Sequence, residues 1–334
     1  MRQVALGVQT DKTPAEYVAL AQLIDQYDVD VVHVYCDLPY TPSYLPLAMM
    51  APHLRRARLG PAGVSLARMT PVDIAADTAF VAQLARGGVS VGLVRGGWLG
   101  DYGVREPERP LQAIREGVAV IRYMLSGGTG GLAGDLFSLA EHAYSPWALP
   151  AGTHVPILIG SWGRRLCALA GEVADEVKIG GSTNPAMLPL VQKWIGRGER
   201  LAARRPRSVA LAIGAVCVAD EDRDLARAAA RRSVAMYLPI VSRLDPTVEV
   251  EPELVDRLQS LFETRDEDGA AGLISDDLLD RFAFSGNAKD LIDQAERLYD
   301  AGATRVEFGT PQGIDSARGI RLIGEQVIPA LQGN

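Results

Sequence analysis

The sequence of 334 residues is poor in the residues that build metal centres and disulfide frameworks. It contains three cysteines, far apart, and four histidines scattered along the chain. No group of these residues has the spacing of a metal site, so we expect no metal ion. His33 lies inside an apolar run and is expected in the core. An odd number of distant cysteines gives no disulfide framework, which favours a reducing compartment and a cytoplasmic protein.

Long apolar runs and an excess of positive charge are also missing. No stretch approaches the roughly 20 apolar residues of a membrane-spanning helix, and the N-terminal run is too short for a signal peptide. The 41 acidic residues outnumber the 34 basic ones, which gives a net charge of −7. Nucleic acids and anionic membranes attract positive surfaces. We therefore expect neither as a partner, and a small-molecule substrate instead.

The sequence does contain a regular alternation of short apolar strands with helices. Thr13 and Thr70 each precede a proline and, three positions on, an acidic residue, which is a typical helix start. Strands are predicted at 3–9, 29–36, 58–65, 89–94, twice within 155–185, at 209–218 and at 305–309. Eight strands alternating with helices favour a (β/α)8 TIM barrel with insertions over a doubly wound sheet. We expect one such domain over residues 1–334.

Two segments interrupt this alternation. Residues 127–150 are rich in glycine and aromatic residues and are predicted to form an insertion or short hairpin before strand five. Residues 233–284 are acidic and partly helical and are predicted to form a helical excursion between strands seven and eight. This excursion would cover the barrel mouth, make a subunit contact, or simply form solvated surface helices.

The segment 155–185 reads VPILIGSWGRRLCALAGEVADEVKIGGSTNP. In it, each of two apolar strands is followed by a glycine-rich loop and the start of a helix. A helix N-terminus offers free backbone N–H groups and a positive dipole end, which suit an anion. Two such loops on neighbouring strands would cradle a phosphorylated cofactor. The alternative is that Gly160, Gly163, Gly180 and Gly181 only make tight turns.

In a TIM barrel the functional groups lie at the C-terminal ends of the strands. These ends are rich in glycine and short of acid–base groups, and the chain has no Walker sequence and no dinucleotide fingerprint at its first turn. Asp37 falls at a strand end, where it would transfer a proton or cap a turn. Tyr40, Tyr44 and Trp98 are candidates for a substrate pocket. This composition suits a protein whose cofactor does the chemistry.

The order and spacing of five segments resemble the bacterial luciferase-like superfamily. The likeness is greatest to its coenzyme F420-dependent, methylenetetrahydromethanopterin reductase-like branch, and it covers roughly residues 3–200. The segments are VDVVHVYCD, LPLAMMAPHLRRARLGPAGVS, TPVDIAADTAFVAQLARGGVSVGLVRGGW, ERPLQAIREGVAVIRYMLSG and PILIGSWGRRLCALAGEVADEVKIGGSTNP. The resemblance implies a barrel that holds a flavin or deazaflavin at its mouth, and a homodimer or higher homo-oligomer.

The resemblance also implies particular residues for the cofactor. A non-prolyl cis peptide that backs the ring is expected at Gly63–Val64, with Ser65 next to it, and Gly96 is expected to contact the cofactor from the following strand. The phosphate is expected on backbone groups after strands five and six. These groups belong to Gly160, Ser161, Gly163, Arg164, Gly180 and Gly181.

Three departures from the family pattern bear on the substrate. The family's Asp-His after strand two is Asp37-Leu38 here, and its Thr-Asn-Pro is Ser65-Leu66-Ala67. The glycine run after strand four lacks its acid and ends in Trp98. These differences argue for a substrate other than methanopterin.

We therefore expect an oxidoreductase that transfers a hydride between reduced coenzyme F420 and a small organic substrate, with Asp37 handling the proton. One alternative is an FMN-dependent luciferase-like monooxygenase. Another is a barrel that binds a ligand without catalysis.

Overall fold

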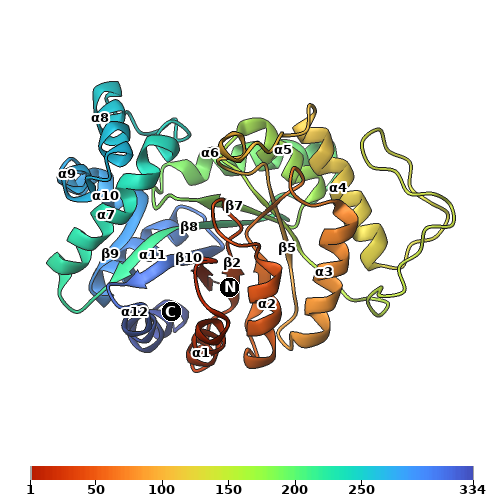
Figure 1. Ribbon diagram of the computed structural model, residues 1–334, viewed down its shortest axis with the longest axis horizontal. Coiled ribbons are helices and arrows are strands. Elements are labelled where there is room, and N and C mark those ends of the chain that lie inside the picture. The colour runs from red at the N-terminus through yellow and green to blue at the C-terminus, as the bar shows by residue number, and fades with distance from the viewer. Residues whose placement is uncertain (1, 334) are drawn as a thin grey trace.

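A parallel β-barrel surrounded by helices forms the centre of the computed structural model, which describes residues 2–333 (Figure 1). The strands are β1 (Gln3–Val8), β2 (Val31–Val34), β3 (Arg58–Pro61), β4 (Val64–Ser65), β5 (Val91–Val94), β6 (Ile157–Gly160), β7 (Glu176–Gly180), β8 (Ala210–Ala219), β9 (Ala283–Gly286) and β10 (Arg305–Gly313). Their order is β3-β2-β1-β10-β8-β7-β6-β5-β4. Since β3 and β4 follow each other in the chain, the sheet curls into a nearly closed ring. This arrangement confirms the predicted TIM barrel.

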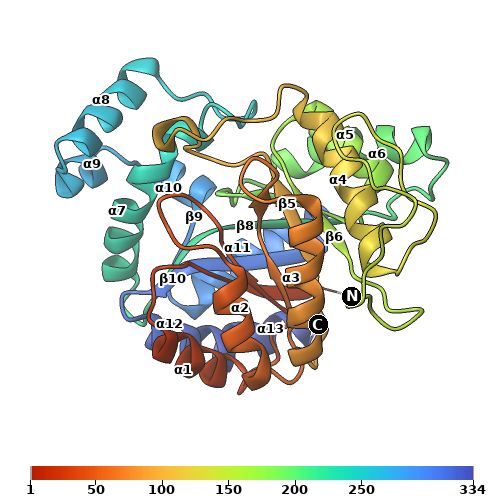
Figure 2. The same ribbon diagram turned by 45° about the vertical axis from the view of Figure 1, so that its right-hand side comes forward.

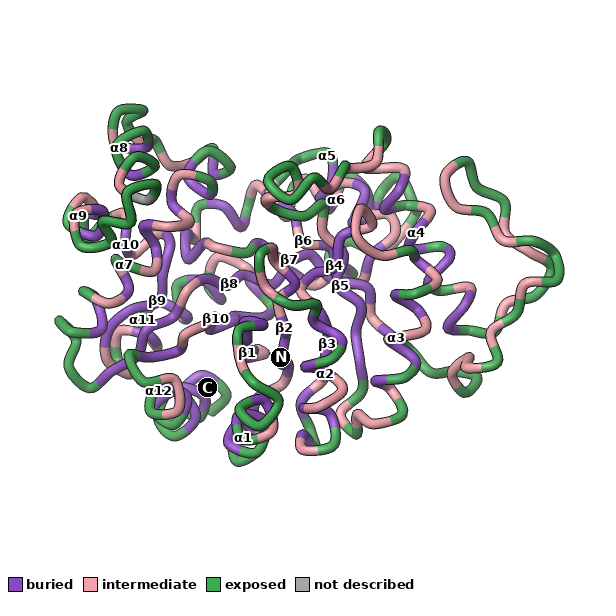
Figure 3. Tube along the Cα trace, in the orientation of Figure 1, coloured by how far each residue is buried: buried purple, intermediate pink, exposed green. Residues whose placement is uncertain are grey.

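The helices follow the strands and cover the outside of the barrel. They are α1 (Pro14–Ile24), α2 (Tyr44–Met50), α3 (Pro71–Leu84), α4 (Pro110–Leu125), α5 (Arg164–Val173), α6 (Met187–Leu201), α11 (Ala288–Asp300), α12 (Ser316–Leu322) and α13 (Ile328–Gln332). Two of them begin as the sequence predicts: Thr13 and Glu16 form a reciprocal capping box, and Thr70 accepts a hydrogen bond from the Asp73 amide. Figure 3 shows the buried residues on the strands and on the inward helix faces. None of the helices among residues 2–333 is long and apolar enough to span a bilayer.

The excursion after β8 begins earlier than the sequence suggests and contains a strand that was not predicted. It comprises α7 (Arg223–Val241), α8 (Pro252–Glu263), α9 (Glu267–Gly272), α10 (Asp276–Phe282) and then β9, which pairs with β8 in parallel. Val234, Leu238, Leu258 and Leu279 form a second, smaller core among these helices. Figure 2 shows α7, α8 and α9 on one side of the barrel and α4, α5 and α6 on the other. The excursion is thus a packed unit beside the barrel mouth.

The segment 127–150 extends away from α4 as a long loop (Figure 1). Within it, all of which the structure describes, the one strand-like pairing is an antiparallel bridge between Leu132 and Leu139. The Glu116 carboxylate on α4 anchors it by accepting hydrogen bonds from the Leu136 and Phe137 amides, at 2.7 and 2.9 Å. These backbone donors lower the pKa of Glu116 to about 2. One ionised side chain on α4 therefore helps to fix the insertion to the barrel.

The α5–α6 contact depends on glycine. A Cβ atom at Gly198 would lie 1.8 Å from the carbonyl oxygen of Ala168, and one at Gly171 would lie 2.2 Å from that of Ile195. The obstacles are backbone atoms, which cannot rotate away. These two glycines therefore set how closely α5 and α6 approach, and with them the loops that precede both helices.

Replacing Gly198 by alanine tests this close contact. Overpacking against a rigid backbone should lower the free energy of unfolding by about 2 kcal/mol or more. Gly196→Ala is the matched control on the same helix, because its Cβ would meet only the end of the Arg200 side chain, at 3.6 Å. That change should raise stability by about 0.5–1 kcal/mol through helix propensity. Urea denaturation of both variants measures the difference, and equal effects would contradict the packing argument.

Candidate functional site

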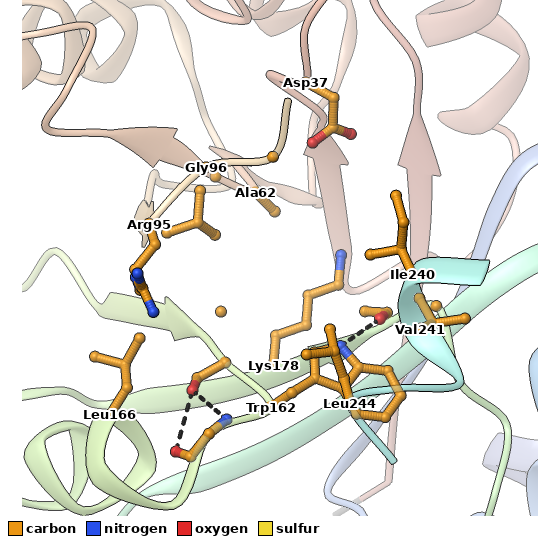
Figure 4. Close-up of a pocket in the computed structure, with 18 of the residues that line it drawn as sticks. Asp37, Ala62, Arg95, Gly96, Trp162, Leu166, Lys178, Ile240, Val241 and Leu244 are labelled. Carbon is orange, nitrogen blue, oxygen red and sulfur yellow. Dashed lines mark hydrogen bonds between the residues drawn. The ribbon is translucent and has the colours of Figure 1, made fainter. Parts of the chain in front are cut away.

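A cavity of about 1320 Å³ opens where the barrel strands end (Figure 4). Its walls come from the segments after β2, β3, β5 and β6, from the end of β7, and from α7. The basic side chains that line it are Arg95, Arg109, Arg164, Arg165 and Lys178, and the acidic ones are Asp37 and Glu106. The excess of positive charge fits an anionic ligand.

A buried carboxylate, Glu307 on β10, organises the floor of this cavity. It accepts hydrogen bonds from His33 Nδ1 at 2.5 Å and from the Tyr35 hydroxyl at 2.8 Å, and it pairs with the Lys178 ammonium on β7. Burial by itself raises the pKa of Glu307, but the charge of Lys178 and these hydrogen bonds outweigh it and lower the pKa. Burial lowers the pKa of His33 to about 4, so the ring is neutral near pH 7. Glu307 and Lys178 therefore form an ion pair with neutral neighbours.

A second buried carboxylate lies one layer deeper. Glu176 on β7 pairs with Arg305 Nη2 at 2.5 Å and with the Arg58 guanidinium. Burial favours its neutral form, but the charges of Arg305 and Arg58 prevail and lower its pKa to about 2. Glu176 is thus ionised near neutral pH.

The sequence contains a signal for both layers. Charged residues recur every second position within apolar strands, as in Glu176 and Lys178 of EVKIG and in Arg305 and Glu307 of RVEFG. In a barrel strand, alternate residues face the interior. Two charged residues at this spacing therefore predict that both side chains lie inside the barrel, where they form ion pairs with each other or with neighbouring strands. His33, expected in the core, belongs to this interior.

The two predicted glycine loops lie together on one wall. The Ser161 amide donates to Lys178 O at 3.0 Å, the Gly163 amide to Ser161 Oγ at 3.0 Å, and the Trp162 indole N–H to Gly180 O at 2.9 Å (Figure 4). Gly163 is the N-cap of α5, and no side chain caps this end. A Cβ atom at Gly180 would find no atom within 4 Å. The uncapped first turn of α5 and the open space beside Gly180 fit the approach of a phosphate.

The opposite wall contains a non-prolyl cis peptide, but its position differs from the prediction. It joins Ala62 and Gly63, so the expected bond at Gly63–Val64 was one residue too late. The reason is that β4 begins at Val64, which pairs with Leu93 of β5 as a regular strand, and the break in the strand comes before it. Ala62 and Gly63 line the cavity.

Val64 and Ser65 do not line the cavity. Val64 is fully buried, and Ser65 donates a hydrogen bond from its hydroxyl to Arg95 O at 2.5 Å. Gly96 does line it, with a φ of 105° that favours glycine. Of the residues predicted after the third and fourth strands, Gly63 and Gly96 can therefore contact a ligand directly.

The candidate substrate residues separate into two groups. Asp37 and Trp98 line the cavity, whereas Tyr40 lies outside its lining. Tyr44 was predicted wrongly. It lies on α2 and is buried, with its hydroxyl 2.9 Å from Thr78 Oγ1, so it packs α2 on α3. Tyr44 lies ten residues beyond the end of β2 and is the first residue of the next helix.

The excursion supplies cavity residues that the sequence did not reveal. Tyr237 and Val241 on α7, with Leu244 beyond it, line the side opposite the cis peptide. The rings of Tyr237 and Trp98 meet edge to face with centroids 6.2 Å apart. Because Tyr237 and Trp98 are far apart in the sequence, this contact had no local signal.

Asp37 points into the cavity from the segment after β2, and Lys178 points toward it from below (Figure 4). Among residues 2–333 no hydrogen bond to the Asp37 carboxylate is recorded. Burial raises the pKa of Asp37, and the charges of Lys178 and Arg68 only partly oppose this. Asp37 is thus suited to carry a proton. The described part of the chain groups no three residues of metal-ligating type.

Comparison with known proteins gives consistent matches. The family model described as luciferase-like monooxygenase matches residues 2–305. The chain is 29% identical over 300 residues to 5,10-methylenetetrahydromethanopterin reductase from Archaeoglobus fulgidus, covering 86% of this chain and 87% of that protein.

Two solved structures have the same fold, and each match covers 99% of this chain and 99% of the other. The coenzyme F420-dependent tetrahydromethanopterin reductase from Methanopyrus kandleri has a TM-score of 0.90 at 22% identity. An F420-dependent secondary alcohol dehydrogenase, in complex with an F420-acetone adduct, has a TM-score of 0.80 at 20% identity.

The deeper carboxylate gives a stability prediction. Glu176→Gln leaves Arg58 and Arg305 without their counter-charge and should lower the free energy of unfolding at pH 7 by about 3 kcal/mol. Since the folded pKa of Glu176, about 2, is below its ordinary value of 4.5, its contribution is complete above pH 4.5 and is lost as the pH falls toward 2. Urea denaturation across this range should show the difference from wild type shrinking. The exposed Glu221→Gln is the control, and a pH-independent difference would refute the argument.

Proposed function

The chain belongs to the luciferase-like monooxygenase family, and on this basis we propose that it is a coenzyme F420-dependent oxidoreductase that acts on a small organic substrate. The observation that supports it most is one cavity at the strand ends that has the glycine loops after β6 and β7 on one wall and the backbone of Ala62 and Gly63 on another. The uncapped start of α5 beside these loops suits a phosphate, and the cavity is large enough for a ring system next to it. The relatives named as F420-dependent enzymes point to the same cofactor.

The residues fit such a cofactor, which when bound supplies or accepts a hydride at a carbon of its deazaflavin ring. The first-turn amides of α5 would hold the phosphate, Gly180 and Gly181 would leave it room, and Arg164 and Arg165 would balance its charge. Ala62 and Gly63 would support one face of the ring. Gly160, Ser161 and Gly163 complete the phosphate loop.

The substrate would then lie between the ring and the remaining walls. Trp98 and Tyr237 close one side and exclude water, which strengthens the electrostatic interactions of the enclosed groups. Asp37 would transfer a proton to or from the substrate, because its raised pKa and free carboxylate suit an acid–base role.

Cofactor binding tests the proposal directly. We expect the protein to bind oxidised F420 tightly and FMN weakly or not at all, measured by quenching of cofactor fluorescence. Gly180→Val should weaken F420 binding by about 10-fold or more, or about 1.4 kcal/mol, since its side chain would fill the space left for the phosphate. It should change stability little, because a Cβ atom at this position meets no protein atom within 4 Å.

Gly272→Val is the matched control, since Gly272 is equally unobstructed but lies on α9, away from the cavity. Tight binding of FMN with no binding of F420 would overturn the proposed function. Unchanged F420 affinity in Gly180→Val would overturn the placement of the phosphate.

Asp37 gives a second prediction. Asp37→Asn should keep F420 affinity and lower kcat by about 10²-fold or more, as for loss of a general acid. In the direction of substrate reduction, the wild-type rate should fall as the pH rises through the pKa of Asp37, which lies above 3.8. The variant should lack this limb of the pH profile. Exposed Asp293→Asn serves as the control, and an unchanged profile in Asp37→Asn would exclude the assigned role.

A further inference from the structure

The ammonium group of Lys178 has hydrogen-bonding capacity that the protein does not use. An ammonium carries three N–H donors, and among residues 2–333 its one recorded acceptor is Glu307 Oε1. The group lies over the Tyr35 ring, 4.8 Å from its centroid, and lines the cavity floor. Figure 4 shows its nitrogen pointing up into the cavity, on the side of Asp37. Donors therefore remain for a ligand atom at this point.

The side chain is held firmly in this orientation. Glu307 is fully buried and is itself fixed by His33 and Tyr35. A Cβ atom at Gly214 would lie 2.7 Å from Glu307 Cβ, and one at Gly7 would lie 1.9 Å from the Tyr35 hydroxyl oxygen. The floor is thus closely packed, and Lys178 is preorganised rather than mobile.

The charges below the cavity leave the Lys178 ammonium available to a negative atom above it. Glu307 offsets the charge of Lys178, Arg58 and Arg305 are paired with Glu176 one layer deeper, and His33 is neutral near pH 7. The Asp37 carboxyl shares the cavity, and burial raises its pKa toward the neutral form. Preorganised N–H donors such as those of Lys178 stabilise negative charge that develops on a substrate atom.

We propose that Lys178 binds the substrate oxygen on which this charge develops, and that the substrates are a carbonyl compound and its alcohol. The inference rests on the proposed function. A carbonyl oxygen becomes negative when its carbon accepts a hydride, whereas an isolated carbon–carbon double bond has no oxygen on which this charge could develop. The neighbouring Asp37 then supplies the proton that this oxygen needs.

The step balances as follows. The hydride from the reduced cofactor forms a bond to the carbonyl carbon, and the π electron pair of the C=O bond moves to oxygen. Oxygen takes a proton from Asp37, which regains one from solvent. The carbonyl compound is reduced by two electrons, and the cofactor is oxidised by two and releases one proton to solvent.

The central experiment replaces Lys178 by methionine, which keeps length and removes charge. The probes are cyclohexanone and butan-2-one, with the cyclic imine 1-pyrroline for comparison, each with reduced F420. Wild type should reduce both ketones, and Lys178→Met should lower their kcat/KM by about 10²–10³-fold, the usual effect of losing one oxyanion donor. Its affinity for F420 and the absorption spectrum of the bound cofactor should not change. Exposed Lys193→Met should behave as wild type.

Lys178→Met leaves Glu307 buried without its counter-charge, so a second variant guards against misfolding. Lys178→Met combined with Glu307→Gln removes both charges and keeps the shape of the pair. It should show the same loss of ketone reduction at wild-type F420 affinity. Glu307→Gln alone keeps the Lys178 ammonium, and it should retain more ketone reduction than Lys178→Met or the double variant.

A readout without cofactor is the titration of Asp37 by carboxyl NMR. The charges facing this group are Lys178 and Arg68, and the tyrosines around it are Tyr35, Tyr40 and Tyr237. Removing Lys178 takes away a charge that lowers the pKa of Asp37, so this pKa should rise in both Lys178 variants.

Three results would overturn the inference while leaving F420 dependence intact. They are reduction of 1-pyrroline but of neither ketone, full ketone reduction by Lys178→Met, and a shifted cofactor spectrum with weaker F420 binding in that variant. The last would place Lys178 against the cofactor ring. Failure of wild type to bind F420 would instead overturn the proposed function and this inference with it.

Discussion

The barrel interior of this protein is built around two buried carboxylates, and the rest of the site depends on how they are neutralised. A carboxylate without water must be paired with positive charge and hydrogen bonds. Glu176 on β7 binds side chains from β3 and β10. Glu307 on β10 binds side chains from β7, from β2 and from the residue that follows β2. The same contacts that satisfy these charges therefore fix the strands against each other at the level of the cavity floor.

This constraint explains why glycine is needed deep in the barrel as well as at its mouth. The Tyr35 hydroxyl occupies space next to Gly7 and Gly309, where Cβ atoms would lie 1.9 and 2.8 Å from it. Charged side chains are bulky, and a barrel of this size accommodates them only where neighbouring positions carry no side chain. The polar side chains of the cavity floor and the glycines around them therefore depend on each other.

The features that could be predicted from the sequence are those that depend on a few consecutive residues. The alternation of strands and helices and the two glycine loops could be inferred because each depends on a few consecutive residues. The cis peptide was placed one residue late, since its position is set by where β4 resumes pairing with β5. Tyr44 was misassigned because it belongs to α2 and packs on α3. The strand β9 was missed because it exists only through its pairing with β8.

The same distinction separates the two sides of the cavity. The side proposed for the cofactor consists mostly of backbone groups from Ala62–Gly63 and the loops after β6 and β7, and backbone exposure requires glycine, which a sequence displays openly. The side proposed for the substrate consists of side chains from segments far apart, such as Trp98, Tyr237 and Lys178. Their identities can change without altering the fold. A barrel of this kind can therefore keep one cofactor site while a few side chains determine the substrate. Among these side chains, Lys178 is held in place by Glu307, one of the two buried carboxylates around which the barrel interior is built.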